Sequence, residues 1–159
     1  MATKKGLIII DIQKDFCDGE ILPAQGTKSL IQPLNDLLVW AGDNNIFCAF
    51  TRDWHPSNHP SFIANGGAWP PHCIQGSKGA EFTEGLFVHP AATIIDIEKD
   101  DIITNITYSA FENTDLDKEL RSREIDEIAV CGIKTEYCVK ATVMDATKLG
   151  YGVMVIIDL

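Results

Sequence analysis

The chain has 159 residues, a length that fits one ordinary domain with one hydrophobic core. Hydrophobic residues make up 45% of it and charged residues 23%, which is typical of folded soluble proteins and excludes the disordered, collagen-like and disulfide-scaffold classes. The formal net charge of −10 repels phosphate backbones and anionic membrane surfaces, and the basic residues form no patch that overrides it. We therefore expect neither a nucleic-acid partner nor a membrane partner.

The first apolar stretch and the cysteines indicate a cellular compartment. Leu7 to Ile10 is too short for a signal-peptide core or a membrane span, and Asp11 closes it at once. The five cysteines are an odd number without a C-x-x-C pair, so neither a disulfide framework nor a zinc finger is expected. These features predict a cytoplasmic protein with mostly reduced thiols.

The first half of the chain predicts a strand, a helix and a second strand. Consecutive apolar residues predict a buried strand over 6–12. A helix is expected over 30–42, with Pro33 in its first turn and Gly42 at its C-terminal cap. Its apolar residues lie at helical spacing: Leu30, Leu34, Leu37, Leu38 and Ala41. A second strand is predicted over 46–52.

A long loop and a further run of strands and helices follow. Residues 55–85 are rich in proline, aromatic residues and histidine, and a loop of this length is usually functional or disordered. Short strands are expected over 93–97, 127–133 and 152–157. Two helices separate them: one begins near Thr114 with a Thr-x-x-Asp capping box and ends near Arg123, and the other spans about 137–149. The alternation predicts a single α/β domain, with a mainly parallel sheet covered by helices on both faces.

The residues just beyond each predicted strand are the candidate site residues, because open parallel sheets bind ligands at the carboxyl ends of their strands. Asp11 lies at the end of the first strand and fits either a turn-capping residue or a general base. Asp53 and His55 follow the second strand. Because Asp53 and His55 are two residues apart in extended backbone, their side chains project to the same side, as a shared metal ion requires.

Three of the four histidines lie between positions 55 and 72, at His55, His59 and His72. A single loop histidine is more often a solvated residue than a ligand, but their clustering favours a metal site. One aspartate and two histidines with open positions suit zinc, iron(II) or manganese(II).

Cys138 is the strongest nucleophile candidate among the five cysteines. It is expected in the first turn of a helix, where the positive end of the helix dipole favours the reactive thiolate. A packed helix residue is the alternative. Cys48 and Cys131 lie in predicted strands and are expected in the core. Cys17 and Cys73 lie in predicted loops, and the sequence does not assign them a role.

Five runs, in this order along the whole chain, resemble the nicotinamidases, also called pyrazinamidases, a branch of the isochorismatase-like cysteine hydrolases. The runs are DIQKDF at 11–16, DWHPSNHPSF at 53–62, WPPHC at 69–73, YSAF at 108–111 and CGIKTEYCV at 131–139. The resemblance implies hydrolysis of nicotinamide to nicotinate and ammonia through a cysteine thioester, in NAD salvage, with pyrazinamide as a further substrate.

By position, the resemblance makes Cys138 the nucleophile, Asp11 the proton acceptor and Lys99 the lysine of the catalytic trio. A carboxylate that takes the thiol proton and later protonates the leaving ammonia is consistent with general acid–base chemistry. The family also implies a cis peptide between Ile133 and Lys134. The backbone amides of Lys134 and Cys138 are the expected oxyanion donors.

The resemblance further implies one divalent metal, with zinc expected ahead of iron or manganese, that binds the pyridine nitrogen. Asp53, His55 and His72 match its ligands, and His59 matches either a further ligand or a residue beside them. The aromatic residues expected to line the ring pocket are Phe16, Trp69 and Tyr108.

Three positions depart from the family pattern. Asp100 follows Lys99 where glycine is usual, and its carboxylate is expected either to restrain or to partly neutralise the lysine. Lys134 replaces a small residue, so its side chain must either point away from the substrate or cover the pocket. Relatives also continue beyond Leu159 for a further helix and strand. The sequence leaves open whether the protein forms a homo-oligomer.

Two alternatives to a nicotinamidase stay open. One is a related amidase or isochorismatase-type hydrolase with another small substrate, although the isochorismatase branch does not need the Asp/His/His set. The other is a catalytically silent binding module on the same fold. That alternative predicts the loss of Asp11, Lys99 or Cys138, and all three are present.

Overall fold

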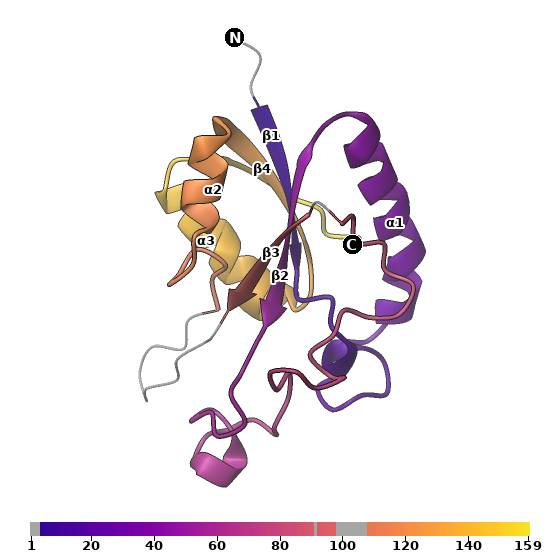
Figure 1. The fold of residues 1–159 in the computed structure, drawn as a ribbon, viewed down its shortest axis with the longest axis vertical. Coiled ribbons are helices and arrows are strands. Elements are labelled where there is room, and N and C mark those ends of the chain that lie inside the picture. The colour runs from indigo at the N-terminus through magenta and orange to yellow at the C-terminus, as the bar shows by residue number, and fades with distance from the viewer. Residues whose placement is uncertain (1–3, 91, 98–107) are drawn as a thin grey trace.

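The computed structural model describes residues 4–90, 92–97 and 108–159. Within these residues, five strands pair in parallel in the order β3-β2-β1-β4-β5 (Figure 1). The strands are β1 (Lys4–Ile10), β2 (Phe47–Asp53), β3 (Thr93–Ile97), β4 (Ile125–Gly132) and β5 (Gly152–Val155). The predicted α/β class with a parallel sheet is confirmed.

Helices cover both faces of this sheet. Figure 1 shows α1 (Thr27–Asp43) on one side and both α2 (Leu116–Ser122) and α3 (Lys140–Lys148) on the other. Two short 3-10 turns, Lys14–Phe16 and Ile63–Asn65, and a π-helical turn, Thr135–Val139, lie in the connections. None of the described helices combines the length and apolar character needed to cross a bilayer.

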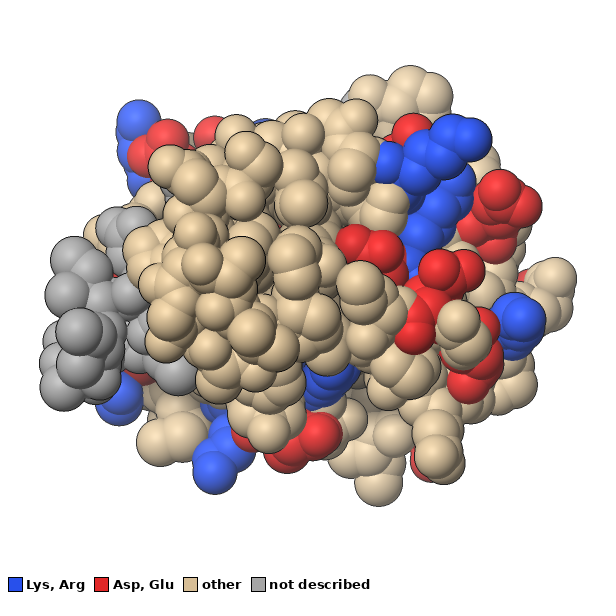
Figure 2. Space-filling view, turned by 90° about the horizontal axis from the view of Figure 1, so that it is seen from below, with Lys and Arg blue, Asp and Glu red and all other residues tan. Residues whose placement is uncertain are grey.

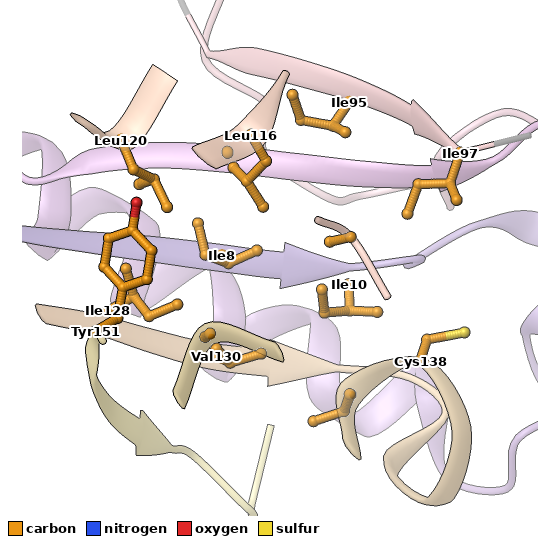
Figure 3. Close-up of a cluster of buried hydrophobic side chains, with 14 of the residues drawn as sticks. Ile8, Ile10, Ile95, Ile97, Leu116, Leu120, Ile128, Val130, Cys138 and Tyr151 are labelled. Atoms are coloured by element: carbon orange, nitrogen blue, oxygen red, sulfur yellow. The ribbon is translucent and has the colours of Figure 1, made fainter. Parts of the chain in front are cut away.

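The central strand β1 is buried on both faces. Leu7 and Ile9 face the cluster that contains Leu34 and Leu38 of α1. Ile8 and Ile10 alternate with them and face the opposite cluster, which is built on α2, α3 and β4 (Figure 3). A strand buried on both faces requires the continuous apolar run that the sequence has here.

Several boundaries differ from the prediction. The first strand ends at Ile10 instead of Ile12, because Asp11 leaves the strand with a left-handed φ of 50°. The predicted helix over 137–149 is preceded by the π-helical turn, which begins at Thr135.

The predicted capping box at Thr114 is wrong. The helix begins at Leu116, and the Thr114 hydroxyl accepts a hydrogen bond from the Leu116 amide at 3.3 Å. The Asp117 carboxylate instead accepts hydrogen bonds from the Tyr151 hydroxyl at 2.7 Å and the Arg121 guanidinium at 3.2 Å. A distant residue, Tyr151, and a neighbour one helical turn away, Arg121, therefore bind the carboxylate that the local pattern assigned to the cap.

Gly132 ends β4 with φ +120°, directly before the segment that carries Cys138. A Cβ at this position would overlap the backbone carbonyl and amide of Ile10. We expect Gly132→Ala to lower the free energy of unfolding by about 3 kcal/mol or more, because backbone atoms cannot move aside cheaply. Urea denaturation measures this loss.

Gly42→Ala is the matched control, because Gly42 is exposed near the end of α1 and a Cβ there meets nothing within 4 Å. That change should be neutral or stabilising by about 0.5–1 kcal/mol. Equal unfolding free energies for the two variants would show that the close approach of β1 and β4 at Gly132 is not a constraint.

Candidate active site

A pocket opens at the carboxyl ends of the strands, between the long loop after β2 and the segment after β4. Its lining includes most of the predicted site residues, namely Phe16, Asp53, His55, His59, Trp69, His72, Tyr108, Lys134 and Cys138. Figure 2 views the molecule from below, with charged side chains around a largely uncharged centre. Chain segments far apart in the sequence therefore meet at the one edge where the parallel strands end.

The buried side chain of Gln13 ties the long loop to the sheet. Its amide nitrogen donates to the carbonyls of Asp53 at 2.8 Å and Ala80 at 2.9 Å, and its oxygen accepts from the Asp53 amide at 2.7 Å. The nearby Asp15 carboxylate accepts from the Cys73 amide at 2.7 Å. Gln13 and Asp15 were not predicted as site residues, although both lie in the DIQKDF run.

Asp53, His55 and His72 converge in the pocket. The Asp53 Oδ2 lies 3.3 Å from His55 Nε2 and 3.5 Å from His72 Nε2. One ligand atom from each of the three buried residues lies within 4.8 Å of the others. Among the described residues, this group has the donor set and spacing of a metal site.

The hydrogen bond of His72 supports a cation at this position. Its Nδ1 lies 2.8 Å from the Pro70 carbonyl, which can only accept, so Nδ1 carries a proton. In the neutral ring, Nε2 then presents a lone pair toward the Asp53 carboxylate, which is also an acceptor. Two facing acceptors need a positive charge between or on them, and a bound metal supplies one while the carbonyl orients the ring. The residues present therefore fit a divalent metal.

His59 lies beside this group instead of within it. Its ring centroid is 4.2 Å from that of His55, and its Nδ1 accepts a hydrogen bond from the Ser61 amide at 3.3 Å. The Ser61 hydroxyl oxygen lies 2.6 Å from the same nitrogen. The tautomer of the His59 ring decides whether Nδ1 donates to or accepts from this hydroxyl. Both roles expected for His59, a further ligand or a residue beside the ligands, therefore stay open.

Cys138 lines the same pocket from the π-helical turn Thr135–Val139. Its side chain ends the apolar cluster beyond Ile10, with the sulfur directed away from the cluster (Figure 3). The turn begins three residues before Cys138, so the helix dipole acts on this thiol more weakly than the sequence predicts. The peptide between Ile133 and Lys134 is cis, as the family resemblance implies.

Asp11 is fully buried at the end of β1. The Thr51 hydroxyl donates to its carboxylate at 2.5 Å and accepts from its backbone amide at 3.1 Å. The preceding residue, Ile10, accepts a hydrogen bond from the Ile133 amide at 3.0 Å, which places Asp11 beside the start of the segment that leads to Cys138. Lys99 and Asp100 lie outside the described residues.

The three predicted ring-pocket aromatics, Phe16, Trp69 and Tyr108, all line the pocket. A fourth aromatic residue, Tyr137, was not predicted. Its ring lies 6.1 Å from Trp69 at 90° and 5.3 Å from Tyr108, so it connects them. Its position directly before Cys138 in the CGIKTEYCV run was the available signal.

The two cysteines on strands, Cys48 and Cys131, have surroundings that differ from those of Cys138. Cys131 is fully buried in the core, as predicted, and burial raises the pKa of its thiol to about 12. Cys48 is half-buried, and burial also raises the pKa of its thiol. Neither thiol lines the pocket that holds Cys138.

We expect iodoacetamide at pH 8 to alkylate Cys138 well before Cys131 in the folded protein. With a pKa of about 12, only about one Cys131 thiol in ten thousand is ionised at pH 8, and the thiolate is the form that reacts. Peptide mass spectrometry over time measures both rates, and denatured protein is the control in which both should react. Equal rates in the folded state would contradict the assignment of Cys131 to the sealed core.

Comparison with known proteins identifies the family. Residues 5–159 match the isochorismatase domain. A nicotinamidase/pyrazinamidase of Mycobacterium tuberculosis is 37% identical, and the match covers 98% of this chain and 85% of the relative. The pyrazinamidase of Pyrococcus horikoshii, solved in complex with zinc, has a TM-score of 0.88 and 39% identity over 96% of this chain and 83% of that one. PnC1 of L. infantum, solved in complex with nicotinate, has a TM-score of 0.84 and 37% identity over 99% and 80% of the two chains. The chain therefore belongs to the isochorismatase family.

Proposed function

We propose that this protein hydrolyses nicotinamide to nicotinate and ammonia, accepts pyrazinamide as a second amide substrate, and acts in NAD salvage. The observation that carries the proposal is one pocket that contains a thiol, an Asp/His/His cluster and aromatic side chains. The relatives named nicotinamidase and pyrazinamidase support the same substrates. A flat aromatic amide fits a pocket lined by Phe16, Trp69 and Tyr108.

The Asp/His/His cluster positions the substrate in this proposal. A divalent metal held by Asp53, His55 and His72, zinc ahead of iron or manganese, would bind the ring nitrogen and orient the ring. The His72 ring is oriented by the Pro70 carbonyl, and Asp53 is oriented by its two backbone hydrogen bonds to Gln13. The amide group then faces the part of the pocket that Cys138 lines.

Cys138 carries out the covalent step. Asp11 takes the thiol proton, and the thiolate attacks the carbonyl carbon, while the backbone amides of Lys134 and Cys138 hydrogen-bond the resulting oxyanion. The carbon–nitrogen bond breaks, and Asp11 returns the proton to the departing ammonia. Water then hydrolyses the thioester to nicotinate and regenerates the thiol. The ammonium of Lys99 completes the trio by stabilising the anionic groups.

Cys138→Ala should lower the rate of ammonia release from nicotinamide by at least about a thousandfold, because a methyl group cannot attack a carbonyl. Bound metal should stay at the wild-type level, since Cys138 is not among the proposed ligands. Cys48→Ala is the matched control, because that half-buried thiol lies outside the pocket, and it should retain activity. Full activity of Cys138→Ala would refute the assigned nucleophile, and its loss of metal would show that the two sites are misplaced.

His72→Ala should weaken metal binding by more than about a hundredfold, because the loss of a ligand exceeds the loss of an outer hydrogen-bond partner. Elemental analysis and competition with a chromogenic chelator measure the affinity. His89→Ala is the control, since His89 is exposed and outside the cluster. Wild-type metal affinity in the His72→Ala variant would contradict the proposed ligand set.

A further inference from the structure

The side chain of Lys134 lies in the pocket. Its backbone is fixed, because the Lys134 carbonyl accepts hydrogen bonds from the amides of Tyr137 at 3.1 Å and Val139 at 3.3 Å. Its half-buried side chain lines the pocket together with Cys138. Of the two orientations that the sequence left open, the structure therefore has the one that covers the pocket.

The Lys134 ammonium approaches the aromatic residues that would hold a ring. Its Nζ lies 5.3 Å from the ring centroid of Phe16 and 6.0 Å from that of Trp69, both within cation–π range. In the described part of the chain, no carboxylate forms an ion pair with this ammonium. A cation that lies near aromatic faces and has no carboxylate partner among the described residues is available to a ligand.

We propose that Lys134 is a specificity-determining residue that makes the pocket prefer a carboxylate over a neutral amide. The inference rests on the proposed function, in which nicotinamide is the substrate and nicotinate the product. These two molecules share one ring and nearly one shape, but only nicotinate carries a negative charge. A partly desolvated ammonium attracts that charge and gains little from the amide. The enzyme consequently retains its product and is inhibited by it.

The test is equilibrium binding of nicotinate and nicotinamide to the metal-loaded protein, measured by calorimetry. Nicotinamide binding is measured in a Cys138→Ala background so that no turnover occurs. Lys134→Met keeps most of the side-chain length and removes the charge, and it should raise the Kd of nicotinate about tenfold, or about 1.4 kcal/mol. The Kd of nicotinamide should change less than about threefold. The difference between the two ligands separates the effect of the Lys134 charge from the effect of its packing.

Two control variants accompany this measurement. Lys140→Met removes the same charge from an exposed position at the start of α3 and should change neither Kd. Lys134→Arg keeps the charge and should restore most of the nicotinate affinity. Added salt should weaken nicotinate binding to the wild type more than to Lys134→Met, because salt screens charge–charge attraction.

Equal weakening of both ligands in Lys134→Met would overturn the inference and make Lys134 a packing residue. Tighter binding of both ligands to Lys134→Met would also overturn the inference, because it would show that the Lys134 side chain obstructs the pocket. An absence of nicotinate binding to the wild type would overturn it as well. Failure of the proposed reaction is distinguishable. In that case no ammonia is released from nicotinamide, while nicotinate still binds in a manner that depends on Lys134.

Discussion

The site depends on the parallel pairing of a central strand that is buried on both faces. Because β1 pairs with both β2 and β4, the chain leaves all three strands at the same edge of the sheet. Asp11 leaves β1 there, Asp53 ends β2, and Cys138 follows β4. Asp53 and Cys138 are far apart in the sequence, and both line one pocket because the sheet register brings these strand ends together.

Buried polar contacts then fix what the strands bring together. Gln13 binds the backbone of Asp53 on both its donor and acceptor sides, and Asp15 binds the amide of Cys73 next to His72. Because an unpaired buried polar group is costly, these bonds hold the long loop in one arrangement. The loop is therefore ordered by the strand ends it covers, and its histidines take defined positions.

The parts of the site that were predictable from the sequence are those set by local pattern. Asp11, Asp53 and His55 follow apolar strand runs, and their shared edge follows from the parallel sheet. Local pattern did not predict the role of Gln13, which depends on a loop 67 residues away in the sequence. The capping box failed partly for the same reason, because Tyr151 binds Asp117 from a distant part of the chain, while Arg121 binds it from one turn further along α2. The π-helical turn before α3 likewise has no sequence period that announces it.

The central claim is that one pocket both orients the ring of nicotinamide and presents its amide to Cys138. The most direct measurement is a crystal structure of the metal-loaded Cys138→Ala variant with nicotinamide bound. We expect a metal peak between Asp53, His55 and His72, the ring nitrogen facing that metal, and the amide carbon beside residue 138. A ligand whose amide points away from residue 138, or a metal bound elsewhere, would contradict the account.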